Sequence, residues 1–449
     1  MSFFAERPRE RLLVTDVNVL DPRDASLRPR AELLVDQGRI QAIGSAGELP
    51  AQGATIFAGA GRTALPGLID SHLHALGTYS LSPPGLADLL EVPDQIRRNL
   101  GALIRSGVTT VRDLGSPLRL VLWLRGLASE GRIDSPRILT SGPILSVPGG
   151  YPLFMPPLPA PLAMLLGQLR VDLSSPRQAM REVDALAERG VDVVKAMYTG
   201  ADYDDARTPM PLLSDVLLRT IAERAHHHGL PVAVHQVWRA ELDRLLELPF
   251  DTLEHLSIDA PMTPGDVERI VVRGLPVSTT LMTYGIRDFA QELLALVEEN
   301  QGRRWAPRAR QGLLGPVREL ARGTFQVPYI GRRVIETGMT HQIVSLGRLR
   351  EAGARVIAGT DQGGAVTPCG CISWELRAIT RAGFSAAQAL RMATSEPAAV
   401  LGLPELAHLA PGHPADLILT RGNPAEDLGA LERVDLVVRD GRIFHRASH

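Results

Sequence analysis

Residues 66–77 read PGLIDSHLHALG, an apolar run that carries two histidines with one residue between them. Successive side chains of a β-strand point to opposite faces, so His72 and His74 point to the same side of the strand that this run predicts. Two neutral imidazoles that converge on one point suit a divalent metal ion. A single His-x-His pair is a weak signal, and other strands must carry matching residues before it predicts a site.

Seven further apolar runs of strand length follow this one. Helical patterns separate most of the runs, such as residues 175–190 and 212–229, each with a serine near its start and a glycine at its end. Eight strands that alternate with helices predict an α/β fold, a (β/α)8 TIM-type barrel. An open doubly wound sheet is the alternative, but no glycine-rich phosphate loop follows the first strand. The seven runs are residues 109–115, 137–143, 191–197, 231–237, 251–257, 276–281 and 355–361.

The two ends of the chain share a pattern of short strands and tight turns. Gln37-Gly38 and Asp440-Gly441 are turn signals, and the second is a strong hairpin signal. We predict that both ends meet in one small β-sandwich domain. The strand candidates are residues 12–20, 31–43, 415–420 and 434–446.

The length of 449 residues suits one large barrel and an accessory domain. The predicted boundaries are residues 1–65 and 405–449 for the two parts of the sandwich, and residues 66–404 for the barrel. Two connections, residues 144–174 and 282–340, are longer than ordinary loops and leave the C-terminal ends of strands. We expect them to form lids or subunit contacts.

The composition excludes several classes of protein. A formal net charge of −2 gives no reason to expect nucleic acid or an anionic membrane as a partner. No apolar run is long enough to span a bilayer, and the N-terminus lacks the features of a signal peptide. With only Cys369 and Cys371, the chain has no disulfide framework. We therefore expect a cytoplasmic protein with two reduced cysteines.

Polar side chains stand near the C-terminal ends of four more predicted strands. An isolated polar group in an apolar interior is costly, and barrels keep their chemistry at this end. Together with His72 and His74, these residues favour a shared metal site over separate core residues. We expect Arg112 and Asp113 to be structural ion-pair and hydrogen-bond partners inside the barrel. The four polar residues are Lys195, His235, His255 and Asp361.

Lys195 is the informative member of this set. A buried ammonium group beside metal ions would be repelled and desolvated, so its pKa would fall. The neutral amine can add carbon dioxide and become a carbamate, whose two oxygens can bridge two metal ions. A carboxylated Lys195 is therefore a hypothesis that the residue types allow.

An ordered set of segments runs along nearly the whole chain: PGLIDSHLH, GVTTVRDLG, VKAM, VAVH, LEHLS and AGTD, then GHPADLILTRGNPAEDL and VVRDGRIFHR. Together they resemble the metal-dependent amidohydrolase superfamily. Within it, the chain is most similar to the imidazolonepropionase-related and prolidase-like hydrolases. That branch includes Xaa-Pro dipeptidases and amidases that cleave N-acyl amino acids such as ochratoxin.

The resemblance implies two divalent metal ions with a shared hydroxide that attacks an amide carbonyl. Asp361 would be catalytic, taking the proton of the hydroxide and delivering it to the leaving nitrogen. The histidine-rich set favours Zn²⁺, with manganese, cobalt or iron as alternatives. The implied ligands are His72, His74 and Asp361 for the more buried ion, His235 and His255 for the more exposed ion, and carboxylated Lys195 as the bridge.

The substrate-facing positions depart from the family pattern. Relatives often carry GGHG after the third strand, and here Tyr151 replaces that histidine. Relatives commonly carry a second histidine two residues after the fifth-strand ligand, where this chain has Val237, followed by Trp238. Tyr198 lies three residues after Lys195, where it could donate to a substrate carboxylate or oxyanion. We predict Tyr151, Tyr198 and Trp238 as substrate-binding residues, with Tyr198 also catalytic.

The predicted function is a binuclear metal-dependent hydrolase that cleaves an amide bond of a small substrate such as a dipeptide or an N-acyl amino acid. One alternative is a cyclic amide or lactone hydrolase similar to imidazolonepropionase. A single-metal deaminase would leave Lys195 without a role, and all six ligand positions being filled argues against an inactive metal-bound scaffold. The expected partners are the small-molecule amide substrate and further copies of the chain in a homo-oligomer, with no nucleic acid and no membrane.

Overall fold

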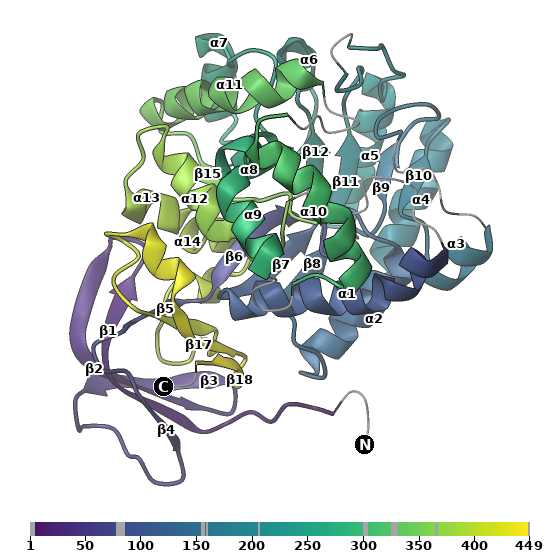
Figure 1. Cartoon of the computed structure of the whole chain (residues 1–449). Helices are drawn as coiled ribbons and strands as arrows, with labels where there is room; N and C mark the ends of the chain where they lie inside the picture. The colour runs from purple at the N-terminus through teal and green to yellow at the C-terminus, as the bar shows by residue number, and fades with distance from the viewer. Residues whose placement is uncertain are drawn as a thin grey trace.

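The computed structural model describes residues 5–77, 86–153, 158, 160–204, 207–299, 304–324, 331–363 and 367–447. Strands from the two ends of the chain gather in one part of the molecule, and helices surround a second group of strands (Figure 1). Parts of the connections 144–174 and 282–340, predicted as lids or subunit contacts, lie outside the described residues.

The second group consists of short parallel strands. Their pairing follows the order β6-β7-β8 in one sheet and β10-β9-β11-β12-β13-β14-β15 in the other. Their bounds are β6 (Leu68–Leu73), β7 (Val108–Asp113), β8 (Arg137–Thr140), β9 (Ile144–Ser146), β10 (Arg170–Asp172), β11 (Val194–Met197), β12 (Val232–His235), β13 (Thr252–Glu254), β14 (Val277–Ser278) and β15 (Val356–Ile357).

Backbone hydrogen bonds join these two sheets at both ends. The N–H of Asp192, just before β11, donates to the carbonyl of Thr140 on β8 at 2.9 Å. The N–H of Thr360, just after β15, donates to the carbonyl of His72 on β6 at 2.9 Å. With these two bonds, the succession of neighbouring strands returns to β6.

The register of the parallel strands brings polar residues at their C-terminal ends to one level. His235 at the end of β12 lies opposite Glu254 of β13, which lies opposite Ser278 of β14. Because parallel strands end at the same edge, side chains distant in sequence meet there.

Helices follow the strands and cover them on the outside (Figure 1). The predicted helices 175–190 and 212–229 correspond to α4 and α5, and Ser175 and Ser214 cap them by accepting hydrogen bonds from backbone N–H groups. The helix bounds are α1 (Leu86–Arg105), α2 (Leu118–Ser129), α3 (Ala160–Leu166), α4 (Pro176–Glu188), α5 (Asp215–His227), α6 (Arg239–Leu245), α7 (Pro264–Val272), α8 (Leu281–Tyr284), η1 (Ile286–Phe289), α9 (Ala290–Glu299), α10 (Pro307–Ala321), α11 (Arg332–Glu351), α12 (Ile372–Thr380), α13 (Ala386–Arg391), α14 (Ser395–Val400), η3 (Pro404–Leu406) and η4 (Leu428–Glu432).

In the part of the chain that the structure describes, no helix combines the length and the apolar character needed to cross a membrane.

Both ends of the chain contribute strands to one sheet, with the order β18-β17-β16-β5-β1-β2-β3 and β4 paired to β1. β5 joins the two ends, since it pairs parallel with β1 and antiparallel with β16. The two ends therefore meet, as the sequence predicts. The bounds are β1 (Leu12–Asp21), β2 (Ser26–Asp36), β3 (Arg39–Ser45), β4 (Thr55–Ala58), β5 (Thr63–Pro66), β16 (Leu417–Thr420), β17 (Val434–Arg439) and β18 (Arg442–Arg446).

This sheet has a buried apolar cluster of its own. Alternate residues of β2, β16 and β17 contribute to it, as expected when one face of a strand is buried, and in β1 an irregularity of the register separates Val14 from Val17. Strands from the beginning and the end of the chain therefore share one apolar layer. The cluster includes Val14 and Val17 of β1, Leu33 and Val35 of β2, Leu417 and Leu419 of β16, and Leu436 and Val438 of β17.

Two turns from opposite ends of the chain touch each other. Gly38 and Gly441 both have a positive φ, +82° and +70°. A Cβ atom on Gly441 would lie only 2.6 Å from the Cα of Gly38. The close contact of the two hairpin turns therefore requires a residue without a side chain.

Replacing Gly441 with alanine is expected to destabilise the protein by about 1–3 kcal/mol more than Gly47→Ala, because it adds a backbone clash. Gly47 is the matched control, since its φ is also +82° but a Cβ there would meet no atom within 4 Å. Denaturant unfolding of both variants measures the difference. Equal destabilisation would contradict the close contact.

Candidate active site

The six residues predicted as metal ligands lie at or near the C-terminal ends of β6, β11, β12, β13 and β15. The ring of His255 lies 4.6 Å from that of His72 and 4.5 Å from that of His235, between centroids. The rings of His72 and His74 are 5.8 Å apart. One oxygen of Asp361 lies 3.2 Å from Nε2 of His74 and 3.7 Å from Nε2 of His72. The four histidines and Asp361 therefore form one group.

Protein groups next to the ring nitrogens orient two of the histidines. Nδ1 of His72 lies 2.8 Å from Oε2 of Glu254. Nδ1 of His255 lies 2.8 Å from Oγ1 of Thr280. A ring nitrogen held in this way fixes the orientation of the imidazole and leaves Nε2 available to a metal ion.

The other two histidines have partners of the same kind. Nδ1 of His74 lies 3.3 Å from the carbonyl oxygen of Gly115, and Nε2 of His235 lies 2.9 Å from the hydroxyl of Tyr203. The nitrogen left for a ligand is therefore Nε2 in His74 and Nδ1 in His235. This pattern of one held nitrogen in each ring is typical of histidines that bind metal.

Glu254 is a buried carboxylate that connects His72 with Arg112. Nη2 of Arg112 donates to Oε1 of Glu254 at 2.7 Å, and both side chains are almost completely buried. Arg112 and Lys195 outweigh the effect of burial and lower the pKa of Glu254. Arg112 is thus a buried ion-pair partner, as expected. Its partner, the ionised Glu254, was not predicted from the sequence.

Lys195 lies on β11 and is buried, with an exposed fraction of 1%. Burial lowers the pKa of Lys195 to about 8, although the charges of Glu254 and Asp361 oppose this shift. Within the described residues, Nζ has no hydrogen-bond partner. A buried amine without a partner is costly, so the position is suited to a group that binds Nζ.

Most of the site histidines are neutral. Burial lowers the pKa of His72, His235 and His255 well below the usual value, and the positive charge of Lys195 adds to this effect. At His74 burial acts in the same direction, but the hydrogen bond to Asp361 outweighs it and raises the pKa. Neutral imidazoles are the form that binds metal ions.

The residues present fit a divalent metal ion. The ligand atoms of His72, His74 and Asp361 lie within 4.8 Å of one another. Burial alone would raise the pKa of Asp361, but the hydrogen bond to His74 and the nearby positive charges outweigh it and lower the pKa, so the carboxylate is ionised. Two imidazoles and one carboxylate are ligands that zinc and similar ions accept.

A buried aromatic cluster lies against His235. The ring of Tyr151 stacks on that of His235 with centroids 5.0 Å apart, and Tyr203 lies 4.8 Å from Tyr151. Trp238 meets Tyr203 edge-on at 5.9 Å, and the hydroxyl of Tyr284 lies 3.3 Å from that of Tyr203. The structure thus brings the predicted Tyr151 and Trp238 together beside the histidines.

Tyr203 and Tyr284 were not predicted. Tyr203 lies in the loop after β11, and Tyr284 lies in the short helix α8. Neither position belongs to a strand pattern or a motif, so the only signal in the sequence is that both residues are aromatic.

Tyr198 does not belong to this aromatic cluster. Its hydroxyl donates to Oδ1 of Asp215, the first residue of α5, at 3.4 Å, and its ring belongs to the main hydrophobic core. Its backbone N–H donates to the carbonyl of His235. The structure places the hydroxyl beside α5, whereas Tyr203 stands next to the ring of His235.

A family model described as Amidohydrolase family matches residues 63–444. The chain belongs to the amidohydrolase family. Members of this family are hydrolases that generally use divalent metal ions, and this chain is accordingly a hydrolase that acts on carbon–nitrogen bonds.

Other proteins are similar to this amidohydrolase over nearly its whole length. An uncharacterized protein of Mycobacterium tuberculosis is 29% identical over 448 residues, with 98% of each chain covered. The crystal structure of another amidohydrolase is 25% identical, with 98% of this chain and 100% of that chain covered and a TM-score of 0.73. The crystal structure of a putative prolidase from Bifidobacterium longum is 25% identical, with 98% and 97% covered and a TM-score of 0.70.

Tyr203→Phe is expected to weaken metal binding by about 10- to 100-fold, because it removes the hydroxyl that orients His235. Tyr198→Phe is the matched control, since its hydroxyl contacts Asp215. Competition with a chromogenic chelator measures the affinity of each variant. The same loss of affinity in both variants would contradict the assignment.

Proposed function

We propose that this amidohydrolase holds two divalent metal ions and cleaves an amide bond of a small-molecule substrate, such as a dipeptide or an N-acyl amino acid. The observation that carries the proposal is the group formed by four histidines, Asp361 and the buried amine of Lys195, in which every histidine has one ring nitrogen held by a protein group. Similarity to a putative prolidase supports a peptide-like amide as the substrate.

In this proposal the two ions have separate ligands and one shared ligand. His72, His74 and Asp361 hold the more buried ion, which the mutual distances of their ligand atoms support. His235 and His255 hold the second ion through Nδ1 and Nε2, the nitrogens not engaged by Tyr203 and Thr280. Zn²⁺ is the favoured metal because imidazole ligands dominate.

Lys195 supplies the shared ligand after carboxylation. The neutral Nζ adds carbon dioxide, a nitrogen–carbon bond forms and one proton is released. Burial supports this step, since it brings the pKa of Lys195 to about 8 and so increases the fraction of neutral amine at neutral pH. Lys195 is also the only lysine in the sequence, and arginine cannot supply a neutral amine.

Bound divalent ions would supply a water of lowered pKa and polarise the amide carbonyl. Asp361 is the proposed catalytic residue, which accepts the proton of the attacking water and passes it to the leaving nitrogen. Tyr151 and Trp238 form an apolar wall that holds the substrate and excludes bulk water. Tyr198 has no catalytic role in this scheme, because its hydroxyl points to Asp215.

We also propose that the ring of parallel strands is a closed (β/α)8 barrel, residues 66–404, and that the sheet from both ends is a separate β-sandwich domain, residues 1–65 and 405–449. The hydrogen bonds that return to β6 and the separate apolar cluster of the sheet support this division.

Assembly and location are further parts of the proposal. Met164 and Leu165 on α3 are each 73% exposed, which supports a contact between copies in a homo-oligomer. Cys369 and Cys371 are buried and form no disulfide in the structure, which is consistent with a cytoplasmic location.

Lys195→Ala and Lys195→Arg are expected to lower the metal content from about two ions per chain to about one and to abolish hydrolysis. Neither side chain can form the carbamate. Elemental mass spectrometry gives the metal content, and a panel of dipeptides and N-acyl amino acids gives the activity. Full activity in Lys195→Arg would refute the bridged site.

A further inference from the structure

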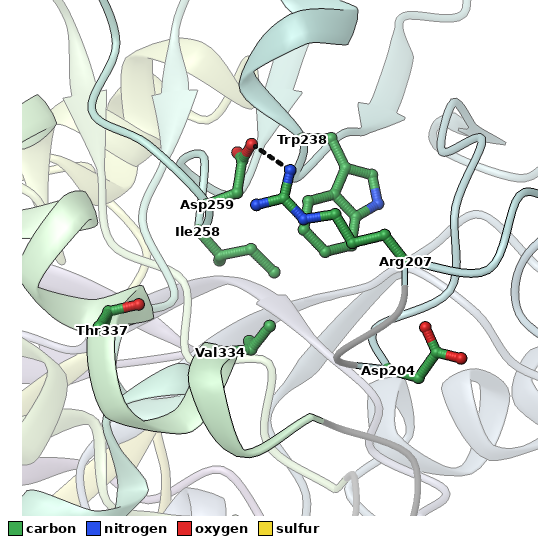
Figure 2. Close-up of a pocket in the computed structure, with 7 residues that line it drawn as sticks. All are labelled: Asp204, Arg207, Trp238, Ile258, Asp259, Val334 and Thr337. Carbon is green, nitrogen blue, oxygen red and sulfur yellow. Dashed lines mark hydrogen bonds and ion pairs between the residues drawn. The ribbon is translucent and has the colours of Figure 1, made fainter.

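A hollow opens beside the aromatic cluster (Figure 2). The ring of Trp238 on its wall lies 5.9 Å from that of Tyr203, whose hydroxyl contacts His235. Two buried aromatic side chains, Trp238 and Tyr203, therefore lie between this hollow and His235. Its lining combines apolar and polar residues: Trp238, Ile258, Val334, Asp204, Arg207, Asp259 and Thr337.

The two carboxylates of this pocket already have partners. Oδ1 of Asp204 accepts from the backbone N–H of Thr208 at 2.8 Å, and Oδ2 accepts from the Thr208 hydroxyl at 2.5 Å. Oδ1 of Asp259 accepts from the backbone N–H of Arg239 at 2.8 Å, and Oδ2 accepts from Nη1 of Arg207 at 3.3 Å. All four carboxylate oxygens are thus engaged within the protein.

Arg207 has N–H donors that no acceptor among the described residues engages. Among the described residues, its side chain makes one hydrogen bond, to Asp259, whereas a guanidinium carries five N–H donors. The side chain is 46% exposed, and its guanidinium lies 4.9 Å from the centroid of the Trp238 ring. Figure 2 shows the guanidinium over the indole, next to Asp259. The ring contact and the ion pair hold an accessible cation at the edge of this hollow.

We propose that Arg207 binds a carboxylate of the substrate and selects amides that carry an apolar arm ending in this group. The guanidinium offers a planar pair of N–H donors that matches a carboxylate. Trp238, Ile258 and Val334 lie beside the guanidinium and offer apolar contacts to the arm. The selection of a substrate rests on the proposed amide hydrolysis, whereas binding of the carboxylate does not.

Calorimetry of the metal-loaded protein with 3-phenylpropanoate and 3-phenylpropanamide tests the binding step. The acid is expected to bind about 10- to 100-fold more tightly than the neutral amide, since hydrogen bonds to a charged group are worth this much. Arg207→Gln should remove the difference and leave binding of the amide unchanged. Arg318→Gln is the matched control, because Arg318 is 51% exposed and pairs with one glutamate on the outer helices.

Two results would overturn the proposal. One is equal binding of the acid and the amide by the wild type. The other is a preference for the acid that survives in Arg207→Gln, since the carboxylate would then be bound elsewhere, for example by the metal ions.

Kinetics on an N-acyl 6-aminohexanoate, whose carboxylate ends an apolar arm, and on its terminal amide extend the test to selection. Arg207→Gln should raise KM for the acid about 10- to 100-fold with kcat nearly unchanged, and should leave both constants for the neutral substrate as they are. An unchanged KM for the acid would overturn the role in selection. Absence of hydrolysis with both substrates would refute the proposed function, while calorimetry would still decide the role of Arg207.

Discussion

The buried amine of Lys195 is the constraint on which the candidate site depends. Desolvation disfavours its charged form, and no hydrogen-bond partner is present among the described residues. Burial also disfavours the charged forms of the surrounding histidines, because it lowers the pKa of His72, His235 and His255 and keeps them neutral. A group of neutral nitrogen ligands is thus held next to the ionised Asp361 and Glu254. Lys195 is the only lysine in the sequence, and its amine, unlike a guanidinium, can lose its proton.

The backbone at the strand ends directs these side chains to one place. His255, Thr280 and Asp361 have positive φ values of +73°, +136° and +53°, a conformation that non-glycine residues rarely adopt. The turn at His255 ends the alternation of β13, so that adjacent Glu254 and His255 both meet the ring of His72. Thr280 in turn holds His255, and its N–H donates to the buried Glu375. The positive φ values direct the ligands but cost free energy, and hydrogen bonds to buried carboxylates such as Glu375 help to hold them.

Much of this arrangement followed from sequence patterns, because strand topology is periodic and the C-terminal ends of parallel strands meet. His72, His74, His235, His255 and Asp361 converge for this reason. The shortness of β14 and β15 did not follow, since Thr280 and Asp361 leave the strand conformation. Tyr203, Tyr284 and Arg207 were also missed, because loops and short helices place them through contacts distant in sequence. The direction of the Tyr198 side chain could not be predicted either. Its spacing from Lys195 indicated the C-terminal end of the strand, but its hydroxyl contacts Asp215 on α5.

Anomalous diffraction at the zinc absorption edge, on crystals of protein produced with zinc, would locate the bound metal ions. We expect two peaks, one beside His72, His74 and Asp361 and one beside His235 and His255, with density for a carboxylated Lys195 between them. A single peak with an unmodified Lys195 would contradict this expectation.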